Sequence, residues 1–340
     1  MENLLSVFDN KTILITGGTG SLGQSLTKRL LKFNVKSIRI FSRNESKQIE
    51  METKFHDDRL RFFVGDIRDL NRLIKATEDA DIVFHTAALK HVPKIEYNPF
   101  EAIKTNVIGS QNVIDACLHE NVEKSICVGT DKAVSPLNTY GATKLLMEKL
   151  FVSANNSINK EKYKTKFIAL RYGNVLGSSG SVIPKFIQQI KSKNKLTITE
   201  PKMTRFSITM DEAINFILNA SNLGQGSEIF IPKLKAYSIK KIKDSLFELL
   251  GNTGDEIIGL RPGEKLQETL INSDELRYTW EINNMYVIIN PFYSLFNGKI
   301  VNDVYDGIQK VDLTKQYSSD NVEQLTVDEL KSLIKNSGLL

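Results

Sequence analysis

The sequence predicts an α/β protein: a Rossmann-type, doubly wound parallel sheet joined to a smaller mixed α/β domain. In the first half of the chain, short β-branched runs alternate with longer amphipathic runs. The first of these runs leads directly into a glycine-rich turn, as in dinucleotide-binding βαβ units. Beyond about Asn174 the alternation stops and the expected elements become mixed. Strands that alternate with helices favour a parallel sheet over an all-β or bundle fold.

The expected elements follow from the apolar periodicity. Apolar runs of strand length predict buried strands at 12–15, 38–41, 62–64, 82–84, 126–128 and 167–170. Pro99 suits a first helical turn, so one long helix is expected from there to about Leu118. In the second half we expect helices near 184–191, 211–222 and 239–250, with short strands near 196–198 and 229–231.

These elements divide the chain into two unequal domains. We predict a dinucleotide-binding domain at 1–173 and a substrate domain at 174–340, partly interleaved with the first. The polar stretch of about 45 residues at the end has no clear periodicity, so its structure is not predicted.

The composition of the chain argues against a nucleic-acid-binding protein, a disulfide-rich or zinc protein, and a membrane protein. The chain has 340 residues with a net charge of +5, a mild excess that gives no support to nucleic-acid binding. Only Cys117 and Cys127 are available, so neither a disulfide scaffold nor a zinc site is expected, and we predict no metal. No apolar run reaches 18 residues and no leader pattern precedes Lys11, so we expect no membrane span and no signal peptide. A cytoplasmic enzyme fits these features.

The glycine-rich turn predicts a dinucleotide site. Gly17, Gly20 and Gly23 follow the first strand, where glycine permits a tight turn and a close approach of the backbone to a pyrophosphate. The helix that begins there offers unpaired N–H groups to the phosphates. A glycine-rich turn that binds nothing is the alternative. The spacing G-x-x-G-x-x-G resembles the short-chain dehydrogenase/reductase superfamily.

Residues at the ends of the next strands bear on the choice of dinucleotide. A site specific for NAD would carry an acid at the end of the second strand. This chain has Ser42, Arg43 and Asn44 there, with Lys47 one turn later. A guanidinium suits a 2′-phosphate, so we predict NADP, with NAD as the alternative cofactor. The structural alternative is that Arg43 is an exposed residue at the end of a strand and binds no cofactor.

Tyr140 and Lys144 form the first candidate catalytic pair. Their spacing of four residues puts both on one face of a helix. A nearby ammonium and a positively charged nicotinamide both stabilise phenolate, so we expect Lys144 and the nicotinamide together to lower the pKa of Tyr140 and let it take a proton from an alcohol.

Thr130, Asp131 and Lys132 follow the expected fifth strand and form the second candidate group. Thr130 supplies the hydroxyl that simple dehydrogenases and epimerases of this superfamily need. The adjacent carboxyl and amine are surplus to that chemistry, and an acid–base pair in a cofactor cleft indicates elimination. An adjacent Asp-Lys pair usually lies on the protein surface. This pair, however, follows the carboxyl end of a strand, and in parallel sheets the carboxyl ends of the strands face the ligand crevice.

Several motifs together carry a specific family resemblance. They are Thr130–Ala133, Pro136–Lys144, Ala87–Pro93, Arg171–Val175, Met203–Phe206, Gly263–Lys265 and Tyr317–Asn321. With them the chain resembles, over nearly its whole length, the inverting UDP-N-acetylglucosamine 4,6-dehydratases of pseudaminic acid biosynthesis. Retaining sugar-nucleotide dehydratases typically carry Asp-Glu where this chain has Asp131-Lys132.

The resemblance implies a lyase that binds its NADP tightly and regenerates it in each cycle. Tyr140 would deprotonate the sugar 4-hydroxyl, Lys132 would remove the C5 proton, and Asp131 would protonate the departing 6-hydroxyl. Homo-oligomers are usual in the family. The implied cofactor contacts are Gly17, Thr19, Gly20, Ser21, Leu22, Gly23, Ser42, Arg43, Asn44, Lys47, Asp66, Ile67, Ala87, Ala88, Lys90, Tyr140 and Lys144. The implied contacts with the UDP-sugar are Lys90, His91, Asn174, Ser179, Ser181, Val182, Thr204, Arg205, Arg261 and Glu264.

Some positions depart from the family pattern, and two other functions stay open. Asn44, Gly129 and Ser179 stand where aspartate, serine and arginine are common. A UDP-hexose 4-epimerase would use Thr130, Tyr140 and Lys144 without the acid–base pair. The third possibility is a catalytically silent nucleotide-sensing protein, against which the retention of Tyr140 and Lys144 counts. His85 is expected to be a packed core residue.

Overall fold

The computed structural model describes residues 6–177, 181–289, 304–311 and 313–340. Within these residues a large central sheet has the strand order β16-β14-β15-β10-β6-β5-β4-β1-β2-β3. The run from β3 to β10 is parallel, and β15, β14 and β16 add to its edge antiparallel. The order 3-2-1-4-5-6 within it confirms the predicted doubly wound fold.

The strands of the central sheet lie close to the predicted runs. Their bounds are β1 Thr12–Thr16, β2 Ser37–Ser42, β3 Leu60–Val64, β4 Ile82–His85, β5 Lys124–Val128, β6 Lys166–Leu170, β10 Glu228–Pro232, β14 Thr279–Ile282, β15 Met285–Ile289 and β16 Gln309–Lys310. Except for β14, β3 and the edge strand β16, these strands are almost fully buried, because helices cover both faces of the sheet.

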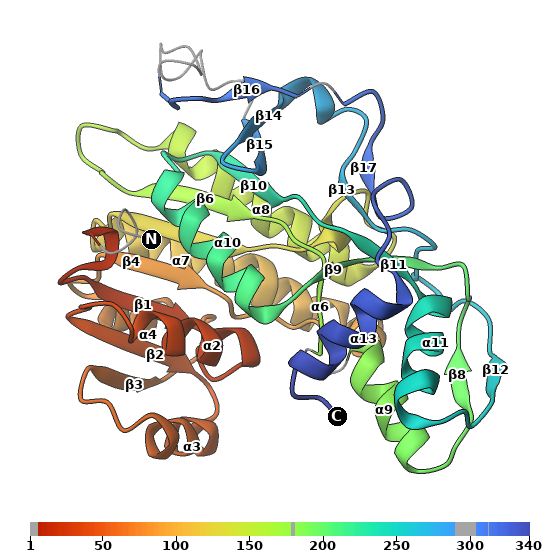
Figure 1. Ribbon diagram of the computed structural model, residues 1–340. Helices are drawn as coiled ribbons and strands as arrows, with labels where there is room; N and C mark the ends of the chain where they lie inside the picture. Colours follow the sequence, from red (N-terminus) through yellow and green to blue (C-terminus); the bar gives the residue numbers. More distant parts are fainter. Residues whose placement is uncertain (1–5, 178–180, 290–303, 312) are drawn as a thin grey trace.

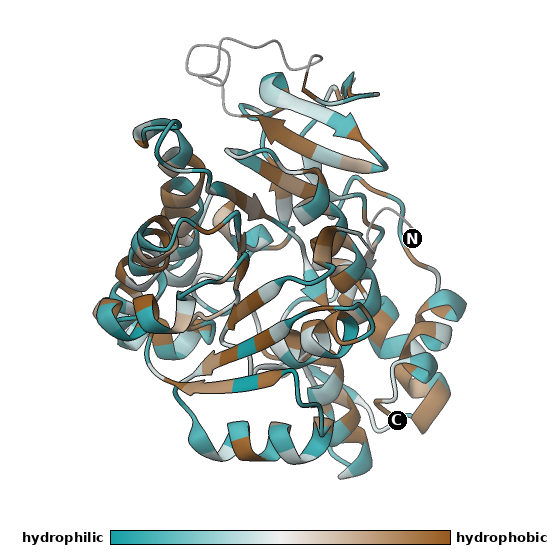
Figure 2. Cartoon of the chain, turned by 90° about the vertical axis from the view of Figure 1, so that its left-hand side faces the viewer, coloured by the Kyte–Doolittle hydropathy of each residue, from teal (hydrophilic) through white to brown (hydrophobic). Residues whose placement is uncertain are grey.

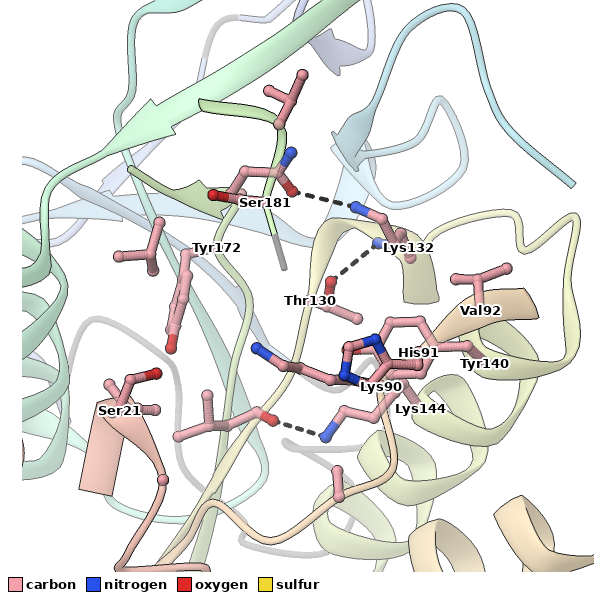
Figure 3. Close-up of a pocket in the computed structure, with 18 of the residues that line it drawn as sticks. Ser21, Lys90, His91, Val92, Thr130, Lys132, Tyr140, Lys144, Tyr172 and Ser181 are labelled. Carbon is pink, nitrogen blue, oxygen red and sulfur yellow. Dashed lines mark hydrogen bonds between the residues drawn. The ribbon is translucent and has the colours of Figure 1, made fainter. Parts of the chain in front are cut away.

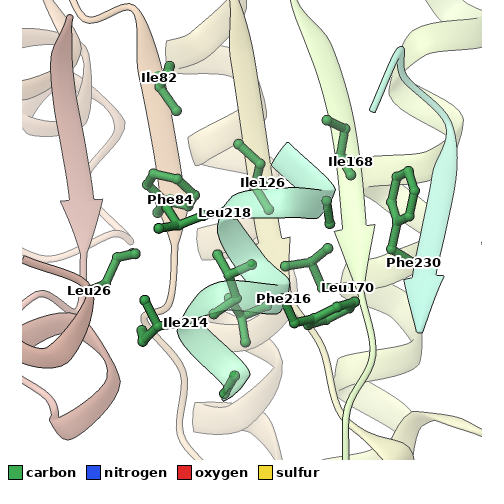
Figure 4. Packing of buried hydrophobic residues seen from close by; sticks show 14 of the residues in the cluster. Leu26, Ile82, Phe84, Ile126, Ile168, Leu170, Ile214, Phe216, Leu218 and Phe230 are labelled. Carbon is green, nitrogen blue, oxygen red and sulfur yellow. The ribbon is translucent and has the colours of Figure 1, made fainter. Parts of the chain in front are cut away.

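Helices form one layer on each face (Figure 1). On one face α2 (Ser21–Leu30), α3 (Glu45–Phe55) and α10 (Met210–Leu223) contribute to one apolar core. Figure 4 shows Ile214, Phe216 and Leu218 of α10 against the sheet. On the other face lie α4 (Leu70–Thr77), α7 (Gly109–His119) and α8 (Thr139–Ser157). Figure 2 shows the brown, apolar strands between helices whose outer sides are largely teal.

The helix expected from Pro99 to Leu118 is interrupted. α5 (Val92–Tyr97) and α6 (Pro99–Ala102) lead into a π-helical stretch, η1 (Ile103–Ile108), and α7 follows. The wide π turn carries the buried Asn106, whose amide bonds Leu89 N and O (2.8 and 3.0 Å) and donates to Thr143 Oγ1 (3.0 Å). Apolar periodicity does not distinguish a π turn from an α turn, so the interruption was not predicted.

A smaller module stands at the carboxyl edge of the sheet. Its apolar core is formed by α9 (Val182–Lys191), α11 (Ile239–Leu250), α13 (Val327–Asn336) and β8 (Leu196–Ile198). The remaining short elements are β7 Asn174–Val175, β9 Thr204–Ile208, β11 Ala236–Ser238, β12 Asp255–Ile257, β13 Thr269–Ile271, β17 Tyr317–Ser318, η2 Asp131–Ala133 and η3 Leu276–Tyr278. Four strands that follow residue 173 in the sequence belong to the central sheet: β10, β14, β15 and β16. The division of the chain into two domains at residue 173 therefore stays a prediction.

The polar end of the chain returns to the rest of the molecule. β17 pairs antiparallel with β13, and α13 packs beside α11 (Figure 1). A capping box formed by Thr326 and Glu329 starts α13. No helix in the described part of the chain is long and apolar enough to cross a membrane.

Candidate active site

A cavity of about 1500 Å³ runs along the carboxyl ends of the parallel strands. The glycine loop, residues 86–93, the end of β5, the start of α8 and segments of the smaller module line it. Parallel α/β sheets bind ligands at this edge. Figure 3 shows side chains of several of these elements around the cavity.

The glycine loop has the geometry that the sequence predicts. Gly17 has φ +68°, and a Cβ placed there would lie 2.8 Å from Ala87 Cα. A Cβ on Gly23 would lie 2.5 Å from the carbonyl oxygen of Gly18. Gly20 precedes α2 and no side chain caps the helix, so the first N–H groups of α2 are open to an anion. Residues 17 and 19–23 all line the cavity, and this cradle fits a dinucleotide pyrophosphate.

The residues predicted at the adenosine end are only partly in the cavity. Lys47 lines it, whereas the others do not: Ser42, Arg43, Asn44, Asp66 and Ile67. Arg43 Nη1 lies 3.6 Å from Asp66 Oδ2, and Arg68 also bonds this carboxylate at 2.7 Å. Asn44 caps α3 by accepting from Lys47 N at 2.9 Å. Burial opposes the negative charge of Asp66, but Arg68 and Arg43 outweigh it and lower the pKa of this carboxyl.

The loop after β4 brings Ala87, Ala88, Lys90 and His91 to the cavity. Asn106 fixes the loop by its two bonds to Leu89, a role that nothing in the local sequence indicated. Burial lowers the pKa of Lys90. His85 is fully buried between Thr16 Oγ1 (2.8 Å) and Ser110 Oγ (2.9 Å), and burial lowers its pKa to about 3.

Tyr140 and Lys144 share the first turns of α8 and both line the cavity. Asn138 caps this helix by accepting from Gly141 N at 2.8 Å. Lys144 Nζ donates to Val128 O at 2.8 Å (Figure 3), and burial lowers its pKa to about 8. Burial raises the pKa of Tyr140, and Lys132 and Thr130 compensate only in part. The lowering expected from Lys144 and a positively charged nicotinamide together stays a prediction.

Thr130, Asp131 and Lys132 form a compact polar group in η2. Thr130 Oγ1 donates to Asp131 Oδ1 at 2.9 Å, and Lys132 Nζ lies 3.1 Å from the same oxygen. Lys132 Nζ also donates to Asn174 Oδ1 at 3.2 Å (Figure 3). Asp131 is fully buried behind the cavity lining, whereas Thr130 and Lys132 line the cavity. Burial alone would lower the pKa of Lys132, but Asp131 and Glu268 outweigh it and raise this pKa.

The predicted sugar-nucleotide residues are only partly brought together. Asn174, Ser181, Val182, Arg205, Arg261 and Glu264 line the cavity. Thr204 does not; its hydroxyl hydrogen-bonds Ser319 Oγ at 2.7 Å. Ser179 lies outside the described residues. The Arg205 guanidinium donates to the carbonyls of Thr204, Lys265 and Leu266, so the protein backbone fixes its orientation.

The polar residues of the cavity that sequence reasoning missed include Tyr172, Lys185, Lys265 and Glu268. Lys265 Nζ donates to Val134 O at 2.6 Å, and Asn138 Nδ2 donates to Gly263 O at 2.9 Å. These bonds tie the segment 261–268 to the loop between β5 and α8. The Gly263–Lys265 motif was the available signal for this segment, and it ends three residues before Glu268. Among the described residues, no cluster of His, Cys, Asp or Glu could hold a metal ion.

Known proteins resemble this chain over nearly its full length. The UDP-N-acetylglucosamine 4,6-dehydratase (inverting) of Campylobacter jejuni strain 81-176 is 45% identical, over 97% of this chain and 99% of the relative. The UDP-glucose 4-epimerase of Rickettsia bellii strain OSU 85-389 is 40% identical, over 97% of each chain. The X-ray structure of Pen from Bacillus thuringiensis superposes with a TM-score of 0.89 at 39% identity, over 98% of this chain and 99% of that one.

Residues 13–290 match the family described as "Polysaccharide biosynthesis protein". This match spans most of the chain, including the glycine loop, the Tyr140–Lys144 pair and the Asp131–Lys132 pair. The chain belongs to the polysaccharide biosynthesis protein family.

Proposed function

We propose that the protein removes water across C5 and C6 of UDP-N-acetylglucosamine and inverts C5, giving a UDP-2-acetamido-2,6-dideoxy-4-hexulose. One observation carries this proposal: a carboxyl–amine pair, Asp131 and Lys132, follows β5, and its amine lines the cavity that Tyr140 also lines. An epimerase needs no such pair. The likeness to the Campylobacter dehydratase supports the same reaction.

A nicotinamide dinucleotide fits the glycine cradle. Residues 17 and 19–23 would hold its pyrophosphate, and the loop with Ala87, Ala88 and Lys90 would lie along the nicotinamide half. When bound, the dinucleotide would accept a hydride from C4 and return it to C6. We propose NADP rather than NAD, because Arg43 and Lys47 offer cations where NAD-specific sites carry an acid.

Tyr140 acts first, as the base that takes the proton of the 4-hydroxyl. Thr130 and the Lys144 ammonium, which line the same cavity, would orient this step. The ketone that forms at C4 acidifies the C5 proton, so an amine can remove it. Lys132 then takes the C5 proton, and Asp131 donates a proton to the departing 6-hydroxyl. Protonation of C5 from the opposite face completes the inversion.

The UDP-sugar would lie toward the smaller module. Arg205 and Arg261 supply two cations that suit a diphosphate. Lys90 and His91 would lie at the sugar and nicotinamide edge, and Asn174 would contact the nucleotide. Ser181 and Val182, at the start of α9, would approach the nucleotide. We also propose a homo-oligomer in the cytoplasm, which makes precursors for nonulosonic acids or surface glycans. The two buried free thiols fit a reducing compartment.

A UDP-hexose 4-epimerase is the second candidate, favoured by the 40% identity with the Rickettsia enzyme. Mass spectrometry of the product separates the two functions. We expect wild-type protein to convert UDP-N-acetylglucosamine into a product lighter by one water. A product of unchanged mass with new stereochemistry at C4 would instead establish the epimerase.

A further inference from the structure

Glu268 is a buried carboxylate in the cavity that the steps above leave without a role. It precedes β13, is 2% exposed and lines the cavity. Its Oε1 lies 3.3 Å from Lys132 Nζ and 3.6 Å from Arg205 Nε. Its Oε2 is buried without a hydrogen-bond partner among the described residues. A buried carboxylate oxygen without a partner costs free energy, so its retention needs a reason.

Ser319, from the polar end of the chain, holds the backbone of Glu268 in place. Its backbone N–H donates to Ser319 Oγ at 2.9 Å, and the Ser319 N–H donates to the Glu268 carbonyl at 2.8 Å. Ser319 Oγ in turn hydrogen-bonds Thr204 Oγ1 at 2.7 Å. The polar end of the chain thus fixes the backbone of a residue that contacts Lys132. This degree of fixation is typical of supporting groups in active sites.

Two carboxylates therefore flank Lys132. Asp131 approaches its Nζ at 3.1 Å and Glu268 at 3.3 Å, while Asn174 accepts its third bond. When Asp131 takes a proton from Lys132 Nζ, the ion pair between these two groups is lost. Glu268 and Asn174 can then still accept hydrogen bonds from the nitrogen and hold it in place.

We propose that Glu268 is a positioning residue for the elimination, which holds Lys132 Nζ and stays anionic while Asp131 carries the transferred proton. This inference rests on the proposed function. Before elimination, a proton moves from Lys132 Nζ to Asp131. The neutral amine then takes the C5 proton, the C5–H electron pair forms the C5–C6 double bond, and the C6–O bond breaks. The leaving oxygen takes the proton of Asp131 and departs as water, so Lys132 ends as ammonium and Asp131 as carboxylate.

The test compares Glu268→Gln with Glu268→Asp and uses Glu248→Gln on the surface helix α11 as the matched control. With UDP-N-acetylglucosamine we expect Glu268→Gln to lower kcat about 100-fold while KM changes by less than about threefold. The kinetic isotope effect with 5-deuterated substrate should rise, because removal of the C5 proton becomes the slow step. Glu268→Asp keeps the charge and should recover part of kcat, and Glu248→Gln should match wild type.

Three outcomes would overturn the inference. Unchanged kcat in Glu268→Gln would remove any role in turnover. A rise in KM alone, with an unchanged isotope effect, would assign Glu268 to substrate binding through Arg205. If Glu268→Gln does not fold, a folded Glu268→Asp with the activity and isotope effect of wild type would contradict the need for a carboxylate at this distance. Failure of the proposed function is distinct, since wild-type protein itself would then release no water.

Discussion

Lys132 Nζ lies 3.1 Å from Oδ1 of Asp131, a carboxylate that is fully buried. At this separation a proton can pass between the two groups, so the pair can present an amine base and a carboxylic acid together. Thr130 donates to the same oxygen, which keeps the carboxylate aimed at Lys132. This relationship underlies the proposed elimination.

Replacing Asp131 by asparagine should stop elimination without emptying the cofactor site. The amide is nearly isosteric but cannot donate the acidic proton, so we expect water release to fall by a factor of about 100 to 10,000. Bound dinucleotide, measured by absorbance after denaturation, should match wild type. The exposed Asp211→Asn serves as control. Full dehydratase activity in Asp131→Asn would refute its role as the acid.

Gly17→Ala should abolish dinucleotide binding. Gly17 has φ +68°, and an added Cβ would lie 2.8 Å from the backbone of Ala87. Gly251→Ala is the matched control, because Gly251 also has positive φ (+97°) but no atom within 4 Å of an added Cβ. Titration calorimetry with NADP and NAD measures binding and tests the preference for NADP. If Gly17→Ala binds as tightly as Gly251→Ala, the cradle is not the pyrophosphate site.

The pKa of Lys144 predicts a pH dependence of stability. Burial lowers this pKa from 10.5 to about 8, so between these values the unfolded chain binds more protons than the folded one. The contribution of Lys144 to the free energy of unfolding should therefore rise from pH 8 to pH 10.5. Urea unfolding of wild type and Lys144→Met over this range measures it. The free energy of unfolding of wild type, relative to that of Lys144→Met, should rise from pH 8 to pH 10.5. A difference that stays constant over this range would contradict the lowered pKa of Lys144.

Arg171→Met should destabilise the whole domain. The Arg171 side chain is fully buried, and it bonds Glu148 of α8 at 2.6 Å and Glu275 at 2.7 Å. Its loss leaves two carboxylates without their cation, which costs about 3–5 kcal/mol of unfolding free energy. Urea denaturation tests this. The double variant Arg171→Met/Glu148→Gln should recover part of the loss, and equal stability of Arg171→Met and wild type would contradict the account.

The local sequence was sufficient to predict the structural features that depend only on residues close together in the chain. The strands of the central sheet in the first half, the glycine turn and the shared helix face of Tyr140 and Lys144 follow from periodicity and spacing. The raised pKa of Tyr140 could not be predicted from the sequence, because the burial that raises it is set by the tertiary fold. The contact between Glu268 and Lys132 could not be predicted either, because it joins segments more than a hundred residues apart in the sequence. Strands β14 and β15 were not predicted either, because an apolar run does not reveal which sheet it joins, and β16 (Gln309–Lys310) contains no apolar residue.

Turnover of UDP-N-acetylglucosamine in D₂O, followed by NMR of the product, tests the central claim most directly. If Lys132 removes the C5 proton and C5 is protonated again from the opposite face, the product carries deuterium at C5 with inverted configuration and has lost the 6-hydroxyl. Lys132→Ala should give no such product while it still binds the dinucleotide. A product that keeps its 6-hydroxyl and the C5 hydrogen, with only C4 inverted, would contradict the dehydratase and identify an epimerase.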